Sequence, residues 1–271
     1  MEKFKNLFKR FIFERSIFFT FVKTLNMKIL NLLAFAFFSL YSCQNKTSTK
    51  AFYEIALVNK IEFTDSDLNQ PRFGCAFLLE YKNQTYAVTA KHLLQVIKPK
   101  KMKTLSFENY IKSWSFFVLD KKNEMITTHS LLNENPTENL ESKSSYINDW
   151  LVFSIKNNGS NVKPLKIRET PLTVGEKLYA VGWTRTMENG SQRVYEFEYY
   201  KTLDNRMLLK DIIVPEKFGG LSGAHVVDEN GNLVGIVSGG TEDPDTKKKY
   251  FSPCTLDNLV AFLDNYQKNK K

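Results

Sequence analysis

The sequence predicts an all-β fold that ends in one helix, and three observations carry this prediction. Short apolar runs of about strand length alternate with turn residues along most of the 271-residue chain. The 22 phenylalanines and 12 tyrosines, against only 12 glycines, favour strands with aromatic cores. Near the end, Leu256, Leu259, Val260 and Leu263 recur at helical spacing instead. The length suffices for one large domain or two small ones.

The first half of the predicted fold contains a hairpin and two further strands. The expected strands are Phe73–Tyr81, Thr85–Thr89, Ser113–Leu119 and Leu151–Ile155. Lys82-Asn83-Gln84 separates the first two and predicts the hairpin turn. The polar stretch Asn133–Ser145 contains a proline and predicts a surface loop.

The second half follows the polar link Asn157–Lys163, so residues 55–160 and 161–271 form the two expected halves. Its expected strands are Lys177–Gly182, Val194–Tyr200, Met207–Val214, Ala224–Val227 and Leu233–Val237. The last two flank Asp228-Glu-Asn-Gly231, whose Asn-Gly pair is typical of a tight turn. A helix over Thr255–Gln267 should pack on the second half, with Thr255 as its cap.

The N-terminal sequence predicts an export signal. Met27-Lys28 precedes the apolar run Ile29–Leu40, and small residues lead to Cys43. About twelve apolar residues are too few to span a bilayer as a mature anchor. The ending Leu-Tyr-Ser-Cys43 resembles the lipobox of bacterial lipoproteins, apart from its tyrosine. That resemblance implies that residues 27–42 are removed and that Cys43 carries a lipid; an ordinary signal or a membrane-anchoring helix is the alternative.

Two segments flank this signal. Residues 1–26 are basic and aromatic, and they are either an extended signal region or are not translated because synthesis starts at Met27. Residues 43–54 follow the cut site, and their polar part predicts a short tether between the lipidated cysteine and the folded chain. The predicted location is therefore the bacterial cell envelope, on a membrane and a face that the sequence does not specify.

The net charge of +9 does not predict nucleic-acid binding. Residues 1–26 contribute +4 and Lys28 adds one, so residues 43–271 carry only +4, without an arginine cluster. No closely spaced Cys or His pair indicates a metal site, and no cofactor is expected. With Cys43 lipidated, Cys75 and Cys254 could either pair or stay buried and reduced.

Three segments hold the residue types of nucleophilic acyl transfer, in the order His92, Asp149, Ser222. His92 follows a strand-like run, and a lone histidine there is more often structural. Asp149 opens an apolar strand, where an acid usually sits at a solvated strand end. Ser222 lies in Gly-Gly-Leu-Ser-Gly, whose glycines permit backbone conformations that aim N–H groups at one point. A glycine-rich turn is the alternative.

Together these segments resemble the trypsin-like (chymotrypsin-fold) serine peptidases. Phe73-Gly-Cys-Ala followed by Ala-Val-Thr-Ala-Lys-His92 is similar to the family's glycine-led strand and its Thr-Ala-Ala-His motif. Asp149-Trp-Leu-Val resembles its aspartate strand, and Gly220-Leu-Ser-Gly-Ala its Gly-Asp-Ser-Gly-Gly. Leu233-Val-Gly-Ile-Val-Ser-Gly-Gly240 resembles the strand that lines the substrate cleft. The resemblance spans about residues 55–265.

The resemblance implies two six-stranded antiparallel β-barrels with the active site between them. It assigns His92 as base and acid, Asp149 as its orienting partner and Ser222 as nucleophile. The N–H groups of Gly220 and Ser222 would form the oxyanion hole. Ser238, Gly239 and Gly240 would pair with an extended polypeptide substrate.

Four positions depart from the family pattern or cannot be aligned with it. Leu221 stands where many members have an aspartate that pairs with a newly cut N-terminus, so activation of that kind is not expected. Lys91 replaces a small residue, and His225 replaces a proline and is expected to be structural. The family's pocket-defining positions do not align through Asp211–Phe218, and Glu216 within that segment is the candidate for a specificity residue.

The preferred hypothesis is a lipid-anchored serine endopeptidase. A chymotrypsin-fold module that binds peptides or envelope partners without cleaving them would use the same cleft. A purely structural envelope lipoprotein would make the complete set of three residues a coincidence. The sequence does not indicate the cleavage preference, the natural substrate or the oligomeric state.

Overall fold

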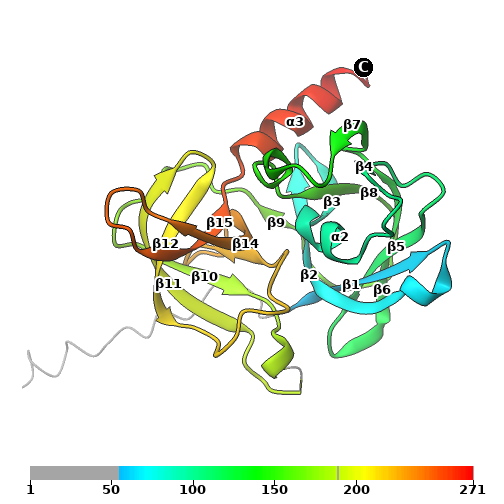
Figure 1. Cartoon of the computed structure of the whole chain (residues 1–271). Helices are drawn as coiled ribbons and strands as arrows, with labels where there is room; N and C mark the ends of the chain where they lie inside the picture. The colour runs from blue at the N-terminus through cyan, green and yellow to red at the C-terminus, as the bar shows by residue number, and fades with distance from the viewer. Residues whose placement is uncertain (1–54, 188, 271) are drawn as a thin grey trace, which may run out of the picture. The chain divides into compact units, whose positions relative to one another are not determined.

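The computed structural model describes residues 55–270 except residue 188, and these residues form two β-barrels followed by a helix (Figure 1). The predicted signal peptide, the lipidation at Cys43 and the tether lie outside the described residues. Lys50–Lys271 constitutes one compact unit. Among the described residues no helix is long and apolar enough to cross a membrane.

Six strands of the first barrel close into a ring in the order β1-β5-β6-β8-β3-β2, with β2 pairing back to β1. Their bounds are β1 Leu57–Phe63, β2 Gln70–Tyr81, β3 Gln84–Thr89, β5 Ile111–Val118, β6 Lys121–Leu131 and β8 Leu151–Asn158. The hairpin predicted from the sequence is confirmed as β2–β3. Lys82 and Asn83 have φ values of +47° and +62°, which is the left-handed pair that matches strand twist in a two-residue hairpin turn.

The second barrel is closed, in the order β10-β11-β12-β15-β14-β13. Its strands are β10 Lys177–Val181, β11 Val194–Leu203, β12 Arg206–Ile213, β13 His225–Val227, β14 Leu233–Glu242 and β15 Lys249–Cys254. The predicted class, all-β with two six-stranded antiparallel barrels and a C-terminal helix, is therefore confirmed.

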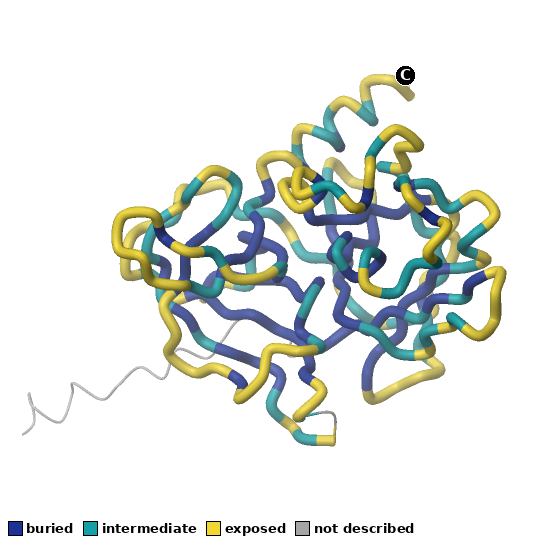
Figure 2. Tube along the Cα trace, viewed as in Figure 1, coloured by how far each residue is buried: buried dark blue, intermediate teal, exposed yellow. Residues whose placement is uncertain are grey.

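Each barrel encloses an apolar core (Figure 2). In the first barrel, the rings of Trp114 and Phe116 pack against Phe153, with centroids 5.4 and 5.8 Å away. In the second, Tyr195 and Phe197 are fully buried, and the Phe197 ring stacks on Phe251 at 4.4 Å. The aromatic-rich composition is thus used in both cores, as the sequence predicts.

The terminal helix α3 (Asp257–Lys268) differs from the prediction in its packing and its cap. Leu259 and Leu263 are buried in a cluster that joins strands of the first barrel to Leu233 and Ile236 of the second. The helix therefore bridges both barrels instead of covering the second half alone. Thr255 is not the cap: Leu256 occupies that position without a side-chain hydrogen bond. Thr255 Oγ1 has no hydrogen-bond partner within residues 55–270.

Three further features were not predicted from the sequence. The expected loop Asn133–Ser145 contains the short strand β7 (Asn135–Asn139), paired with β4 (Thr104–Leu105). β9 (Leu165–Lys166), from the second half, pairs in parallel with β2 of the first barrel. Strands β1, β6 and β15 carry charged or polar residues at many positions, so they lack the apolar runs by which the other strands were predicted.

Candidate active site

The fold brings the three predicted chemical residues from separate elements to the junction of the barrels. His92 lies in the first turn of α2 (Lys91–Ile97), directly after β3. Asp149 lies two residues before β8. Ser222 lies in the loop that connects β12 of the second barrel to β13. All three residues therefore lie outside the strands, in a loop or in the first turn of a helix.

Two hydrogen bonds join His92 to Asp149. The imidazole Nδ1 lies 2.7 Å from Asp149 Oδ2, and the His92 backbone N–H donates to Oδ1 at 2.7 Å. The Asp149 side chain is 1% exposed and that of His92 is 16% exposed. The carboxylate accepts the Nδ1 proton, so the neutral imidazole keeps Nε2 unprotonated and ready to accept a proton.

Ser238 contributes a contact that the sequence did not indicate. It was predicted to pair with substrate through its backbone, but its Oγ also donates to Asp149 Oδ2. Burial raises the pKa of Asp149, and the hydrogen bonds from His92 and Ser238 outweigh this effect, so the net pKa is lowered. The carboxylate thus stays ionised in the core. The only sequence signal for this role was the position of Ser238 at the end of a buried strand run.

The loop that carries Ser222 packs directly against β2 and against the end of β3, just before His92. Cys75 of β2 donates its N–H to the Ser222 carbonyl at 2.7 Å. Gly223 has φ +83°, and a Cβ there would lie 2.2 Å from the Cys75 carbonyl and 3.0 Å from Ala90 N. Only glycine permits this approach. The half-buried Ser222 hydroxyl makes no hydrogen bond with any residue in 55–270, His92 included.

The predicted oxyanion donors lie in the same loop. Gly220 has φ +109°, a conformation that glycine adopts readily. The Gly219 carbonyl accepts from the Arg185 N–H at 2.8 Å, and the Leu221 carbonyl accepts from Ala224 N–H at 3.0 Å. Because C=O and N–H of a trans peptide point in opposite directions, the N–H groups of Gly220 and Ser222 point away from those partners. Within residues 55–270 neither N–H has an acceptor.

Apolar packing holds this loop against the core of the second barrel. Leu221 is fully buried in the core of the second barrel, in the same cluster as Cys75, Trp183 and Ala224. The Cys75 thiol lies 3.3 Å from the Gly220 carbonyl. Burial raises the pKa of Cys75 to about 12, so the thiol stays protonated and can donate to that oxygen. Cys75 and Cys254 are both free and buried, which answers the question of their pairing.

The predicted substrate strand has an unpaired edge. In β14, Gly239 and Gly240 pair with Ser252 and Phe251 of β15 on one side. On the other side, β13 reaches β14 only as far as Ile236. Both glycines are exposed, and nothing lies within 4 Å of a Cβ built on Gly239. An extended peptide can therefore add to this edge beside Ser222.

Of the positions that departed from the family pattern or did not align, Lys91 and His225 are buried and Glu216 is exposed. Lys91, beside His92, is buried and forms an ion pair with Glu138 of β7. His225 is buried within β13 and meets the Phe77 ring edge-on at 5.9 Å. Burial lowers its pKa to about 4. Glu216 is exposed in the loop before Ser222. Across the described residues no cluster of three or more His, Cys, Asp or Glu side chains could hold a metal ion.

The Trypsin family matches residues 73–259. None of the curated proteins matches the sequence. Among solved structures, the serine endoprotease of Yersinia pestis is 14% identical, with a TM-score of 0.52 over 83% of this chain and 68% of that one.

Two further solved structures share the fold at similarly low sequence identity. The active form of the Rv3671c protease of M. tuberculosis is 12% identical, with a TM-score of 0.51 over 81% of this chain and 84% of that one. Neuropsin, a serine protease expressed in the limbic system of mouse brain, is 14% identical, with a TM-score of 0.52 over 81% and 96%. The family match covers more than half of the sequence and includes all three chemical segments, so this chain belongs to the trypsin family of serine endopeptidases.

Proposed function

We propose that this chain hydrolyses peptide bonds through an acyl-enzyme on Ser222, with His92 and Asp149 as the other two members of its catalytic triad. The observation that carries the proposal is the buried Asp149 carboxylate, which binds the His92 imidazole at Nδ1 and its backbone N–H at the same time. Such a carboxylate fixes the tautomer and stabilises the imidazolium that forms during the reaction.

In the proposed reaction His92 Nε2 takes the proton of the Ser222 hydroxyl while Oγ attacks the scissile carbonyl. The N–H groups of Gly220 and Ser222 stabilise the resulting oxyanion. His92 then gives its proton to the leaving amine, and water repeats the sequence to release the acid and restore the serine. The open edge at Gly239 and Gly240 holds the substrate backbone as an added strand.

A fluorophosphonate probe tests the nucleophile, because labelling requires an activated serine. Residues 44–271 contain the whole compact unit and should label once, whereas Ser222→Ala should not label and should lose about 10⁴–10⁶ in turnover of an unfolded protein substrate. Ser66→Ala, at an exposed position outside the site, is the matched control and should label normally. Undiminished hydrolysis by Ser222→Ala would refute the mechanism.

One observation favours a second candidate, a peptide-binding module that does not cleave. The Ser222 hydroxyl and the His92 imidazole are not hydrogen-bonded to each other in the described chain. Such bonds are often long in free enzymes and tighten when substrate binds. A chain that binds unfolded peptides at the β14 edge, yet neither labels nor cleaves, would favour this candidate.

We further propose that the protein is exported and anchored to a membrane of the bacterial cell envelope through a lipid on Cys43. Support comes from the basic start at Met27, the apolar run Ile29–Leu40 and the small residue before the cysteine. Metabolic labelling with a radioactive fatty acid should mark the wild-type protein and not Cys43→Ser. Equal labelling of both proteins, or none of the wild type, would contradict the lipid anchor.

A further inference from the structure

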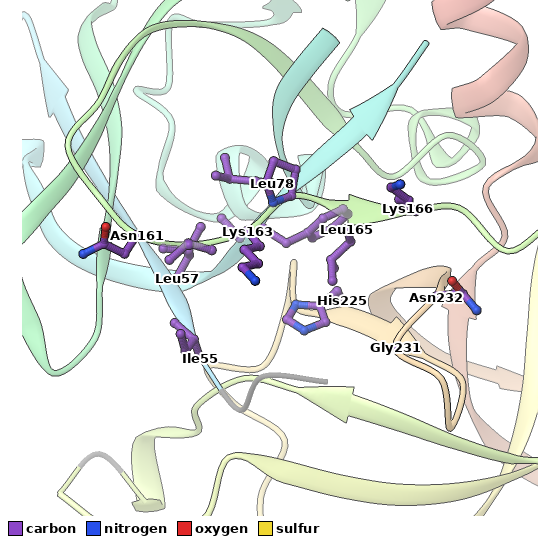
Figure 3. A pocket seen from close by; sticks show the side chains of 14 residues that line it. Ile55, Leu57, Leu78, Asn161, Lys163, Leu165, Lys166, His225, Gly231 and Asn232 are labelled. Carbon is purple, nitrogen blue, oxygen red and sulfur yellow. The ribbon is translucent and has the colours of Figure 1, made fainter. Parts of the chain in front are cut away.

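A second concave site lies between the barrels, and none of the predicted catalytic residues lines it. This cavity of about 330 Å³ is walled by β1 and β2 of the first barrel, by the connecting segment 161–166, and by β13 with its following turn (Figure 3). Ile55, Leu57 and Leu78 face Leu165 across it, so most of its surface is apolar. Its volume lies at the lower end of the range for small-molecule sites.

One buried polar side chain in the wall of this cavity lacks a partner. His225 is only 5% exposed, and its imidazole lies beside Lys163 and Leu165 in the cavity wall (Figure 3). Within residues 55–270 its buried Nδ1 has no hydrogen-bond partner. Buried polar groups are nearly always paired, so this imidazole points to a bound molecule that supplies a partner.

Among the described residues that line the cavity, the only charged side chains outside the imidazole are lysines. Lys163 and Lys166 line it and are exposed, and Asn161 and Asn232 add neutral polar groups. No aspartate or glutamate is among the described residues that line it. An anion is therefore favoured at this site over a cation. The neutral imidazole always carries one N–H, which can donate to an anionic oxygen.

From this combination we propose that the cavity binds a small carboxylate with an apolar body, of the size of a medium-chain fatty acid. The apolar body lies against Leu57, Leu78 and Leu165, and the carboxylate accepts hydrogen bonds from His225 and faces the two lysines. The site goes beyond the proposed peptidase activity. The cavity is nevertheless close to Ser222 in sequence, because β13, which carries His225, begins three residues after Ser222.

Isothermal titration of residues 44–271 with octanoate tests the proposal, with octanol and octylammonium as probes of the same length. Octanoate should bind once per chain and more tightly than either probe. Lys163→Gln with Lys166→Gln should weaken octanoate about three- to tenfold. Lys100→Gln with Lys101→Gln, exposed lysines that do not line the cavity, should leave its affinity unchanged.

A second variant fills the cavity without touching His225. Val162 is half-buried in the connecting segment and lines the cavity, so Val162→Trp should abolish octanoate binding while thermal unfolding stays cooperative. Equal binding of octanol, or unchanged binding by Val162→Trp, would overturn the proposal. Binding that emerges only after Phe52→Ser and Tyr53→Ser would also overturn it, because the cavity would then belong to the chain's own preceding segment.

Discussion

The buried imidazole of His225 should make the stability of the fold fall on mild acidification. Burial lowers its pKa from an ordinary 6.5 to about 4, so in the folded protein it stays neutral until the pH is close to 4. In the unfolded chain the same side chain takes up a proton near pH 6.5. Below that pH the unfolded state binds more protons than the folded state, and the free energy of unfolding decreases.

The size of this effect follows from the two pKa values. The difference of about 2.5 units corresponds to about 3 kcal/mol once the pH is below both values, and roughly 2–3 kcal/mol is lost between pH 7.5 and 4.5. In His225→Gln this contribution is absent, because the amide does not titrate. The variant should be less stable than wild type at pH 7.5. The difference in free energy of unfolding between the two proteins should be smaller at pH 4.5 than at pH 7.5, by roughly 2–3 kcal/mol.

Urea unfolding of both proteins at four pH values between 7.5 and 4.5 measures the difference. The acid sensitivity of the carboxylates is common to both proteins and cancels when the two curves are subtracted. His129→Gln, on the exposed side of β6, is the matched control that also removes one imidazole. The experiment is run without added carboxylates, which the cavity beside His225 could bind. Parallel stability curves for wild type and His225→Gln would refute the reasoning.

Three further predictions concern the site and its support. Ser238→Ala removes a donor to the Asp149 carboxylate, so kcat/KM for a peptide substrate should fall about 5- to 30-fold and its acid limb should move to higher pH; an unchanged pH profile would contradict the role. Leu221→Asp buries a carboxyl group in an apolar core and should lower the melting temperature and abolish fluorophosphonate labelling, whereas Leu221→Met should do neither. Glu138→Gln leaves the Lys91 ammonium buried without its carboxylate and should cost about 3 kcal/mol in urea unfolding, more than Lys91→Met; the opposite order would contradict the pairing.

Local signals carried the parts of the fold that the sequence predicted correctly. The β2–β3 hairpin was evident because Lys82-Asn83-Gln84 interrupts two apolar runs, and Asn tolerates the left-handed backbone found at Asn83. The end of β3 before His92 and the start of β8 after Asp149 could be predicted because polar residues bound an apolar run there as well. Prediction of the two barrels required the family resemblance, since the first ring depends on the pairing of β1 with β5, which places Leu57 opposite Val118.

The features that sequence reasoning missed depend on three-dimensional packing. The apolar positions of α3 define a buried face but not its neighbour, and that face meets Phe77 and Trp150 of the first barrel as well as the second. Thr255 has the residue type of a helix cap, yet its hydroxyl is buried and the helix begins later. The bond from Ser238 to Asp149 spans 89 residues, and no local pattern could indicate it.

The surroundings of Leu221 explain how a trypsin-family loop can hold its shape without a buried ion pair. Three interactions fix the loop from inside the core. The Leu221 side chain packs beside Trp183, the Cys75 thiol reaches the Gly220 carbonyl, and the Cys75 N–H binds the Ser222 carbonyl. All three belong to the folded barrels themselves. They therefore form when the chain folds, and we expect that no newly cut amino terminus is needed to order the loop around Ser222. Cys75→Ala should loosen this loop, and a larger fall in fluorophosphonate labelling rate than in thermal stability would distinguish that effect from general destabilisation.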